Sequence, residues 1–291
     1  MNWKPKHDYS KIVLAIHGYN DYANAFKIPG SYLSKHGINL ISFDLKGFGR
    51  NADRGEWYDM TVHLEDIIFN VKKIKKENPG KSIFLLGESM GGAILLSLIN
   101  KKRELPISGV ILVAPAIWNF SESNFFKSIP LKILSKLLPH MKTNGKGLIK
   151  VQASNNFKLL NELSKDKFFI HKPTFESLQG IVDLMDESFV DTKEYVTKPS
   201  YKTFFLIPMK DEIVPRKPII KILKNNDNIP NNILVKAYQD SYHMMLRDKQ
   251  GNNITEDIKN WINNENFIKN QSTHKDTLKT FENSKFYHRL D

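Results

Sequence analysis

The sequence contains no cysteine, which excludes disulfide bonds, thiolate catalysis and cysteine-ligated metal sites. It also lacks an apolar run long enough to span a bilayer. Its first residues, MNWKPKHDYS, lack the apolar segment of a signal peptide. We therefore expect a cytoplasmic protein whose contact with membranes, if any, is peripheral and on the inner face.

Acidic side chains are scarce relative to basic ones. The chain has 31 Asp and Glu against 43 Lys and Arg, a formal net charge of +12. Such a charge could attract it to anionic membranes or to nucleic acid. However, the sequence has no zinc finger, RNP-like aromatic motif or other recognised nucleic-acid module. We therefore favour lysines spread over solvated faces and no nucleic-acid partner, with weak peripheral contact with an anionic membrane as a hypothesis to test.

Residues 81–92, KSIFLLGESMGG, combine the patterns of a strand, a sharp turn and a helix. The apolar run 83–86 is bounded by polar residues, as in a strand buried on both faces of a sheet. Gly87 to Gly91 match G-x-S-x-G, and an apolar helical stretch follows. This context is typical of a nucleophile elbow, with Ser89 at a helix N-terminus. The alternative interpretation is a glycine-rich turn with a surface serine.

Strand-like and helix-like segments alternate along most of the chain. The predicted strands are 11–17, 38–45, 83–86, 107–114, 203–208 and 233–238. Between them, residues 60–77 carry apolar side chains at helical spacing. This alternation predicts an α/β fold with a doubly wound, mostly parallel sheet. Sites in such sheets lie at the carboxyl ends of the strands.

The alternation stops after Trp118. Residues 118–200 contain no predicted buried strand and show helical patterns at 131–140, 155–163 and 174–186. We therefore predict a core formed by 1–117 and 201–266, with 118–200 inserted as a helical lid. Thr255 is the predicted N-cap of a helix over 255–261. Residues 267–291 are polar, and we expect a loosely attached tail.

One predicted lid helix lies within residues 128–141, SIPLKILSKLLPHM. Pro130 suits the first turn of a helix. Leu131, Leu134, Leu137 and Leu138 then recur at helical spacing among lysines. An apolar stripe with basic residues indicates an interfacial segment, but it fits packing on the core as well. The two interpretations are compatible.

A serine hydroxyl is a poor nucleophile at neutral pH, so Ser89 needs a base. His243 lies just beyond the last predicted strand, in a loop that can reach back over the elbow. Asp211 follows the strand 203–208 and can orient the imidazole and stabilise its charged form. Glu212 is the competing candidate for that acid. The chain order Ser, Asp, His is typical of an elbow nucleophile.

The tetrahedral intermediate of acyl transfer needs two donors for its oxyanion. The backbone N–H of Met90, directly after the nucleophile, is the first candidate. The second should come from the loop His17-Gly18-Tyr19 after the strand 11–17, and the N–H of Tyr19 is the preferred choice. That dipeptide His17-Gly18 alone would indicate no more than a turn at a strand end.

The segments HGYNDYANAF, FDLKGFGR, GESMGG, PMKDEIVP and SYHMM together resemble the monoacylglycerol lipase and lysophospholipase branch (serine aminopeptidase-like) of the α/β hydrolases. The likeness extends over residues 3–266 and includes the lid stretch 154–189. It implies an α/β-hydrolase fold with a lid after the sixth family strand. It also implies Ser89 as nucleophile, Asp211 as acid and His243 as base, with Tyr19 and Met90 as oxyanion donors.

The resemblance has one departure at the N-terminus. Members of that branch usually have two strands before the one corresponding to 11–17, and only ten residues precede it here. The first two family strands are therefore expected to be missing. Either the sheet is shortened or the natural start lies further upstream.

We predict a cofactor-free and metal-free serine hydrolase of carboxylic esters, acting through an acyl-enzyme. The resemblance implies a lipid-like substrate, a monoacylglycerol or a lysophospholipid. An aminopeptidase, amidase or thioesterase with the same triad is the alternative enzyme. A non-catalytic lipid-binding module is the alternative from another class, and the intact triad argues against it.

Overall fold

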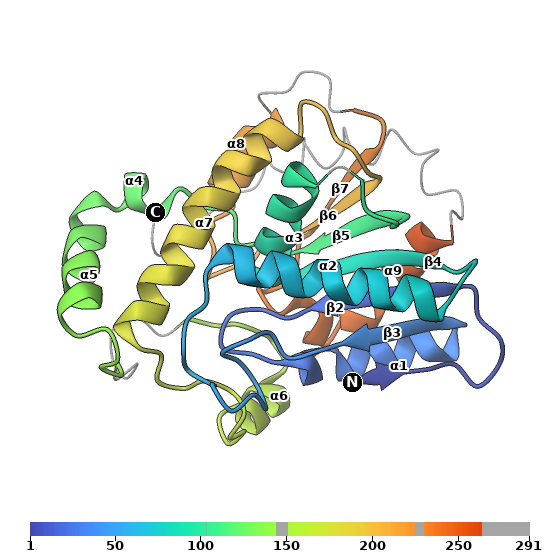
Figure 1. The fold of residues 1–291 in the computed structure, drawn as a ribbon, viewed down its shortest axis with the longest axis horizontal. Helices are drawn as coiled ribbons and strands as arrows, with labels where there is room; N and C mark the ends of the chain where they lie inside the picture. Colours follow the sequence, from blue (N-terminus) through green and yellow to red (C-terminus); the bar gives the residue numbers. More distant parts are fainter. Residues whose placement is uncertain (103, 144–150, 225–229, 264–291) are drawn as a thin grey trace.

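The computed structural model describes residues 1–102, 104–143, 151–224 and 230–263. Its centre is a seven-stranded sheet of order β1-β3-β2-β4-β5-β6-β7 (Figure 1). The strands are β1 (Asn2–Trp3), β2 (Lys11–Ile16), β3 (Ile38–Ser42), β4 (Ser82–Glu88), β5 (Gly109–Val113), β6 (Thr203–Pro208) and β7 (Ile233–Tyr238). All pairings are parallel except that of β1 with β3. The predicted α/β class and mostly parallel sheet are confirmed.

Each central strand buries side chains on both of its faces. In β2, Ile12, Leu14 and Ile16 join one apolar cluster, while Val13 and Ala15 join the other, as the alternation of side chains along a strand requires. Helices cover both faces of the sheet (Figure 1). They are α1 (Lys27–Lys35) and α9 (Gly251–Ile262) on one face, and α2 (Met60–Glu77), α3 (Met90–Lys101), α7 (Phe175–Tyr195) and α8 (Lys217–Lys224) on the other.

A short strand precedes residue 11, which corrects the expectation that none does. Trp3 of β1 pairs with Leu40 in antiparallel register. The indole of Trp3 lies so close to Gly30 of α1 that a Cβ there would come within 2.6 Å of it. Two residues are too few to show a strand pattern in sequence, so only the tertiary pairing reveals this one.

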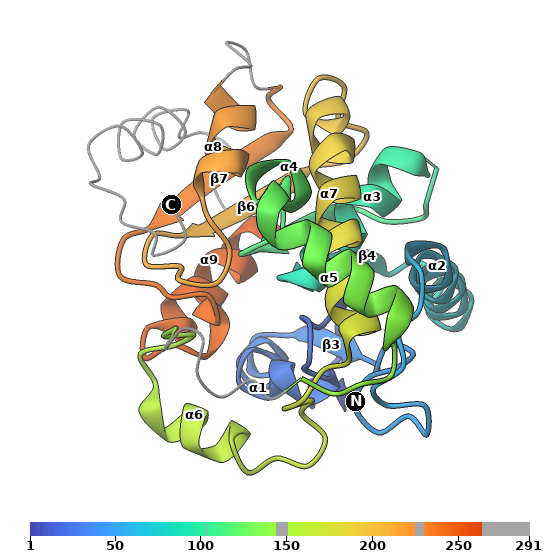
Figure 2. The same ribbon diagram turned by 90° about the vertical axis from the view of Figure 1, so that its left-hand side faces the viewer.

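Residues 118–200 form four helices in the part that the structure describes: α4 (Phe120–Ser123), α5 (Phe125–Leu137), α6 (Phe157–Leu163) and α7. Helix α7 packs along α3 of the core, and α5 lies on the outer side of α7 (Figure 2). We keep the division into core and lid as a proposal. Helix α7 lies in the predicted lid, but its apolar side chains belong to the main apolar cluster of the core. The predicted tail 267–291 lies outside the described residues.

Two predicted helix starts were wrong. Helix α5 begins at Phe125, so Pro130 lies inside it rather than in its first turn. Helix α9 begins at Gly251, and the hydroxyl of Thr255, the predicted N-cap, donates to the carbonyl of Gly251 within the helix at 2.8 Å. Ser, Thr and Pro are compatible with several helix positions, so they indicate a boundary only weakly.

Candidate active site

Ser89 lies at the turn between β4 and α3 in a strained conformation, with φ 56° and ψ −117°. Such a φ is uncommon for a residue with a side chain. The flanking glycines are required by close backbone approach. A Cβ on Gly87 would lie 2.4 Å from the carbonyl oxygen of Gly91, and one on Gly91 would lie 2.2 Å from that of Ile16. This geometry is the sharp strand-to-helix turn that G-x-S-x-G predicts for a nucleophile elbow.

Of the three residues predicted as a triad, His243 lies within hydrogen-bonding distance of both others. Ser89 Oγ is 2.8 Å from His243 Nε2, and His243 Nδ1 is 2.7 Å from Asp211 Oδ2. The backbone N–H groups of Ile213 and Val214 donate to the other oxygen of Asp211 at 2.8 and 3.0 Å. Asp211 and His243 are buried, whereas Ser89 is half-buried. The arrangement can pass a proton from the serine hydroxyl to the imidazole.

The charges of this pair stabilise each other. Burial alone would raise the pKa of Asp211, but His243 and the backbone donors outweigh it and lower that pKa. Burial alone would lower the pKa of His243, but the charge and hydrogen bond of Asp211, with a contribution from Glu88, raise it. A protonated imidazole at this position is therefore stabilised by its surroundings.

Glu212, the competing candidate for the acid, has a different partner. Its Oε2 accepts a hydrogen bond from the backbone N–H of Gln152 at 2.8 Å. That bond connects the loop of the acid to the segment between α5 and α6. The geometry therefore favours Asp211 as the partner of His243.

The two predicted oxyanion donors lie beside Ser89. Met90 is the first residue of α3, so its N–H has no acceptor within the helix. On the other side, a Cβ on Gly18 would lie 3.1 Å from Ser89 Cβ, which places the loop of Tyr19 beside Ser89. His17 fixes this loop, because its Nδ1 donates to the Gly18 carbonyl at 2.9 Å and its Nε2 accepts from the N–H of Leu45 at 3.0 Å. Burial lowers the pKa of His17, in keeping with this neutral form.

Sequence reasoning missed a buried ionic cluster behind the site. Arg247 Nη1 donates to Asp21 Oδ2 at 2.7 Å, and its Nη2 donates to Glu88 Oε2 at 3.0 Å. Burial raises the pKa of Glu88, and the charge of Arg247 opposes that shift. The sequence offers one signal for this cluster. A carboxylate at the end of an apolar strand is expected to be buried and to need a cation.

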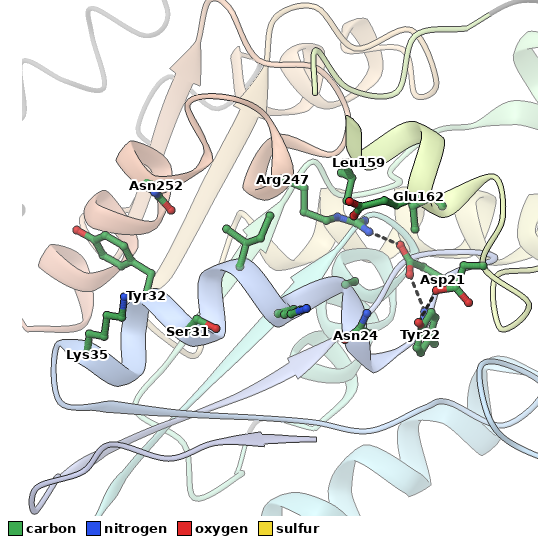
Figure 3. Close-up of a pocket in the computed structure, with 15 residues that line it drawn as sticks. Asp21, Tyr22, Asn24, Ser31, Tyr32, Lys35, Leu159, Glu162, Arg247 and Asn252 are labelled. Carbon is green, nitrogen blue, oxygen red and sulfur yellow. Dashed lines mark hydrogen bonds and ion pairs between the residues drawn. The ribbon is translucent and has the colours of Figure 1, made fainter. Parts of the chain in front are cut away.

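A cavity of about 460 Å³ adjoins this cluster. Figure 3 shows its lining, in which α1 contributes Tyr32 and α6 contributes Glu162, while Arg247 points toward Asp21. None of the triad residues is among the described residues that line it. The cavity is therefore separate from Ser89, with Arg247 and Asp21 in its wall.

A protein-family model described as serine aminopeptidase, S33, matches residues 7–250. Human monoglyceride lipase is 29% identical over 143 residues, which are 48% of this chain and 46% of that protein. Phospholipase YtpA of Bacillus subtilis is 22% identical over 256 residues, 87% of this chain and 94% of that protein. The match to the human lipase therefore spans less than half the length of either chain.

Solved structures show the same fold. A monoacylglycerol lipase of Paleococcus ferrophilus aligns with a TM-score of 0.74 at 16% identity, covering 90% of this chain and 96% of that one. A soluble variant of the Saccharomyces cerevisiae monoglyceride lipase, in complex with a substrate analog, also aligns with a TM-score of 0.74, at 21% identity over 91% and 90% of the two chains. At such identities the likeness concerns the fold alone. Because the family model matches most of the chain, the protein belongs to the serine aminopeptidase S33 family of α/β hydrolases.

Proposed function

We propose that the protein is a serine hydrolase of the lipase or esterase type that cleaves carboxylic esters of lipid-like substrates, monoacylglycerols or lysophospholipids. The observation that carries the proposal is the continuous chain of hydrogen bonds from Ser89 through His243 to Asp211. The similarity to monoglyceride lipases and to a phospholipase supports the substrate class.

In the proposed reaction Ser89 Oγ attacks the ester carbonyl while His243 Nε2 accepts the hydroxyl proton. The carbonyl oxygen becomes an oxyanion, which the N–H groups of Met90 and Tyr19 stabilise. His243 returns the proton to the departing alcohol, leaving an acyl-enzyme. Water then attacks the acyl carbon with the same base, and the fatty acid leaves as Ser89 regains its proton. Asp211 keeps the imidazole oriented throughout.

The outer face of α5 supports the proposed contact with an anionic membrane. The leucines of the predicted apolar stripe differ in exposure. Leu131 and Leu134 are half-buried, whereas Leu137 is 71% exposed. Other apolar side chains extend the outer face, and Phe126 is 89% and Ile133 51% exposed. The apolar side chains of α5 are therefore divided between packing and exposure.

Basic side chains border this exposed apolar face. Lys127, Lys132 and Lys136 are all exposed on α5. Near an anionic membrane each lysine would contribute about 1 kcal/mol of attraction. No helix in the described parts of the chain is long and apolar enough to cross a membrane. We propose that α5 belongs to a lid over the site and rests on the lipid surface that holds the substrate.

A fluorophosphonate probe tests the proposed nucleophile directly. The wild type should be labelled at Ser89, and Ser89→Ala should lose both labelling and ester hydrolysis while retaining its fold by circular dichroism. Substantial remaining activity would remove Ser89 from the mechanism. A folded wild type that is not labelled would favour the non-catalytic lipid-binding module.

Substrate panels test the bond and the chain length. Hydrolysis of p-nitrophenyl esters of increasing acyl length should be compared with that of a monoacylglycerol, a lysophospholipid, a thioester and an aminoacyl p-nitroanilide. The proposal expects esters to be preferred and activity to continue to long acyl chains. Preference for the anilide or the thioester would instead establish the corresponding alternative enzyme.

A further inference from the structure

The buried ionic cluster joins three segments that each carry one part of the proposed mechanism. Asp21 lies two positions after Tyr19. Glu88 directly precedes Ser89, and Arg247 lies four positions after His243. The first segment follows β2, the second is the end of β4, and the third follows β7. They are distant in sequence but meet at the carboxyl ends of the strands. The guanidinium of Arg247, which belongs to the segment of the proposed base, therefore binds both the proposed oxyanion loop and the proposed nucleophile elbow.

The cluster is almost completely removed from water. The side chain of Arg247 is 5% exposed, and those of Asp21 and Glu88 are each 3% exposed. A guanidinium is planar and presents several fixed donors, so it can bind two carboxylates in set directions. In a buried site the loss of that cation leaves two carboxylates without compensation, and their segments must move or admit water.

We propose that Arg247 is a positioning residue: by binding Asp21 and Glu88 together, it sets the spacing between His243, Ser89 and the oxyanion loop. This inference rests on the proposed function. Asp211 is fixed separately by backbone donors of its own loop, so Arg247 positions the remaining parts. A displacement of about 1 Å between reacting groups can lower the rate about 10²-fold.

The cavity beside Arg247 would let a small cation reach the cluster, which makes a chemical rescue experiment possible. Because Arg247 forms part of its wall (Figure 3), truncation to alanine extends the cavity toward the two carboxylates. A free guanidinium ion could then enter and bind both of them. Rescue by guanidinium separates positioning from general destabilisation, because sodium at equal ionic strength cannot make the same planar contacts.

The experiment compares Arg247→Ala with the wild type in p-nitrophenyl butyrate hydrolysis and in the rate of fluorophosphonate labelling. We expect kcat to fall about 10²-fold with little change in KM, and labelling to slow in parallel. Millimolar guanidinium should raise kcat several-fold at a temperature where circular dichroism shows the variant folded. The wild type should show no such increase.

Lys236→Met is the matched control, because it breaks another ion pair without touching the three segments. Lys236 of β7 binds Asp257 of α9 at 2.6 Å. This variant should lose stability but keep the wild-type kcat, with no response to guanidinium. If Arg247→Ala does not fold, Arg247→Lys keeps the charge but cannot reproduce the fork, and it should still show lowered kcat and slow labelling.

The outcomes separate two failures. A wild type that is not labelled at Ser89 contradicts the proposed function itself. If the wild type is labelled and a folded Arg247 variant reacts as fast, Arg247 has no positioning role. The same conclusion follows if the lost activity equals the unfolded fraction and guanidinium restores none of it.

Discussion

The crowding at Gly91 allows the elbow to be perturbed without removing any reacting group. Gly91 is the second residue of α3, where the helix begins against β2. A Cβ added there would lie 2.2 Å from the carbonyl oxygen of Ile16 and 2.7 Å from that of His17. Both atoms are backbone, so no side-chain rotation can relieve the contact. Gly91→Ala should therefore push the start of α3 away from the end of β2.

The size of the effect follows from these distances. Real Cβ atoms almost never approach another heavy atom within 3.0 Å, so the two backbones must separate by about 1 Å, enough to lower a rate about 10²-fold. Overpacking of this kind costs about 1–3 kcal/mol of stability. Replacing glycine by alanine within a helix would by itself stabilise it by about 1 kcal/mol. A net loss of stability would therefore show that the steric contact with β2 outweighs the gain in helix propensity.

Gly80→Ala provides the control. Gly80 lies in the turn before β4 with φ +81° and nothing within 4 Å of an added Cβ. This variant should lose about 1 kcal/mol through backbone strain, with unchanged kcat/KM. Thermal unfolding and p-nitrophenyl butyrate hydrolysis measure both variants. Wild-type activity in Gly91→Ala would refute the claim that the approach of α3 to β2 fixes the catalytic geometry.

The remaining predictions concern the acid, the base and α5. Because the pKa of His243 is raised and only neutral imidazole accepts a proton, kcat/KM should rise with pH through a midpoint above about 6.5; a midpoint below that value would contradict the assignment. Asp211→Asn should lower kcat about 10⁴-fold and Glu212→Gln should have little effect, whereas the reverse ranking would assign the acid to Glu212. Phe126→Asp with Ile133→Asp should weaken co-sedimentation with anionic vesicles, and equal binding would place the membrane contact elsewhere.

The sheet and the meeting of Ser89, Asp211 and His243 could be predicted because both follow from local patterns. The core strands are buried on both faces, so their apolar runs are nearly continuous. In a parallel sheet the carboxyl ends of all strands lie on the same side of the sheet. Asp211 lies three positions after the end of β6 and His243 five positions after the end of β7, so the topology brings both loops to the end of β4 that carries Ser89. Side-chain direction need not be known for this argument.

The outer helices were predicted less well because their sequences fit several positions. Helix α2 is confirmed at Met60–Glu77, since one face is apolar and a proline and glycine follow it. Helix α5 has apolar side chains around much of its circumference, so the sequence does not say which of them pack on α7. The structure leaves Phe126 exposed and packs Leu131 against the main cluster.

The ionic cluster depends on side-chain directions across long separations, which is why no sequence pattern could assemble it. Asp21 and Arg247 are 226 positions apart, and Glu88 and Arg247 are 159 apart. A single Asp in a polar loop, or an Arg after a histidine, is ordinary surface composition. Only the burial of all three together shows that the charges compensate one another. Topology places Ser89, Asp211 and His243 at the carboxyl ends of the strands. We infer that buried contacts such as those of Arg247 set the spacing between these loops, in which a displacement of about 1 Å would lower the rate about 10²-fold.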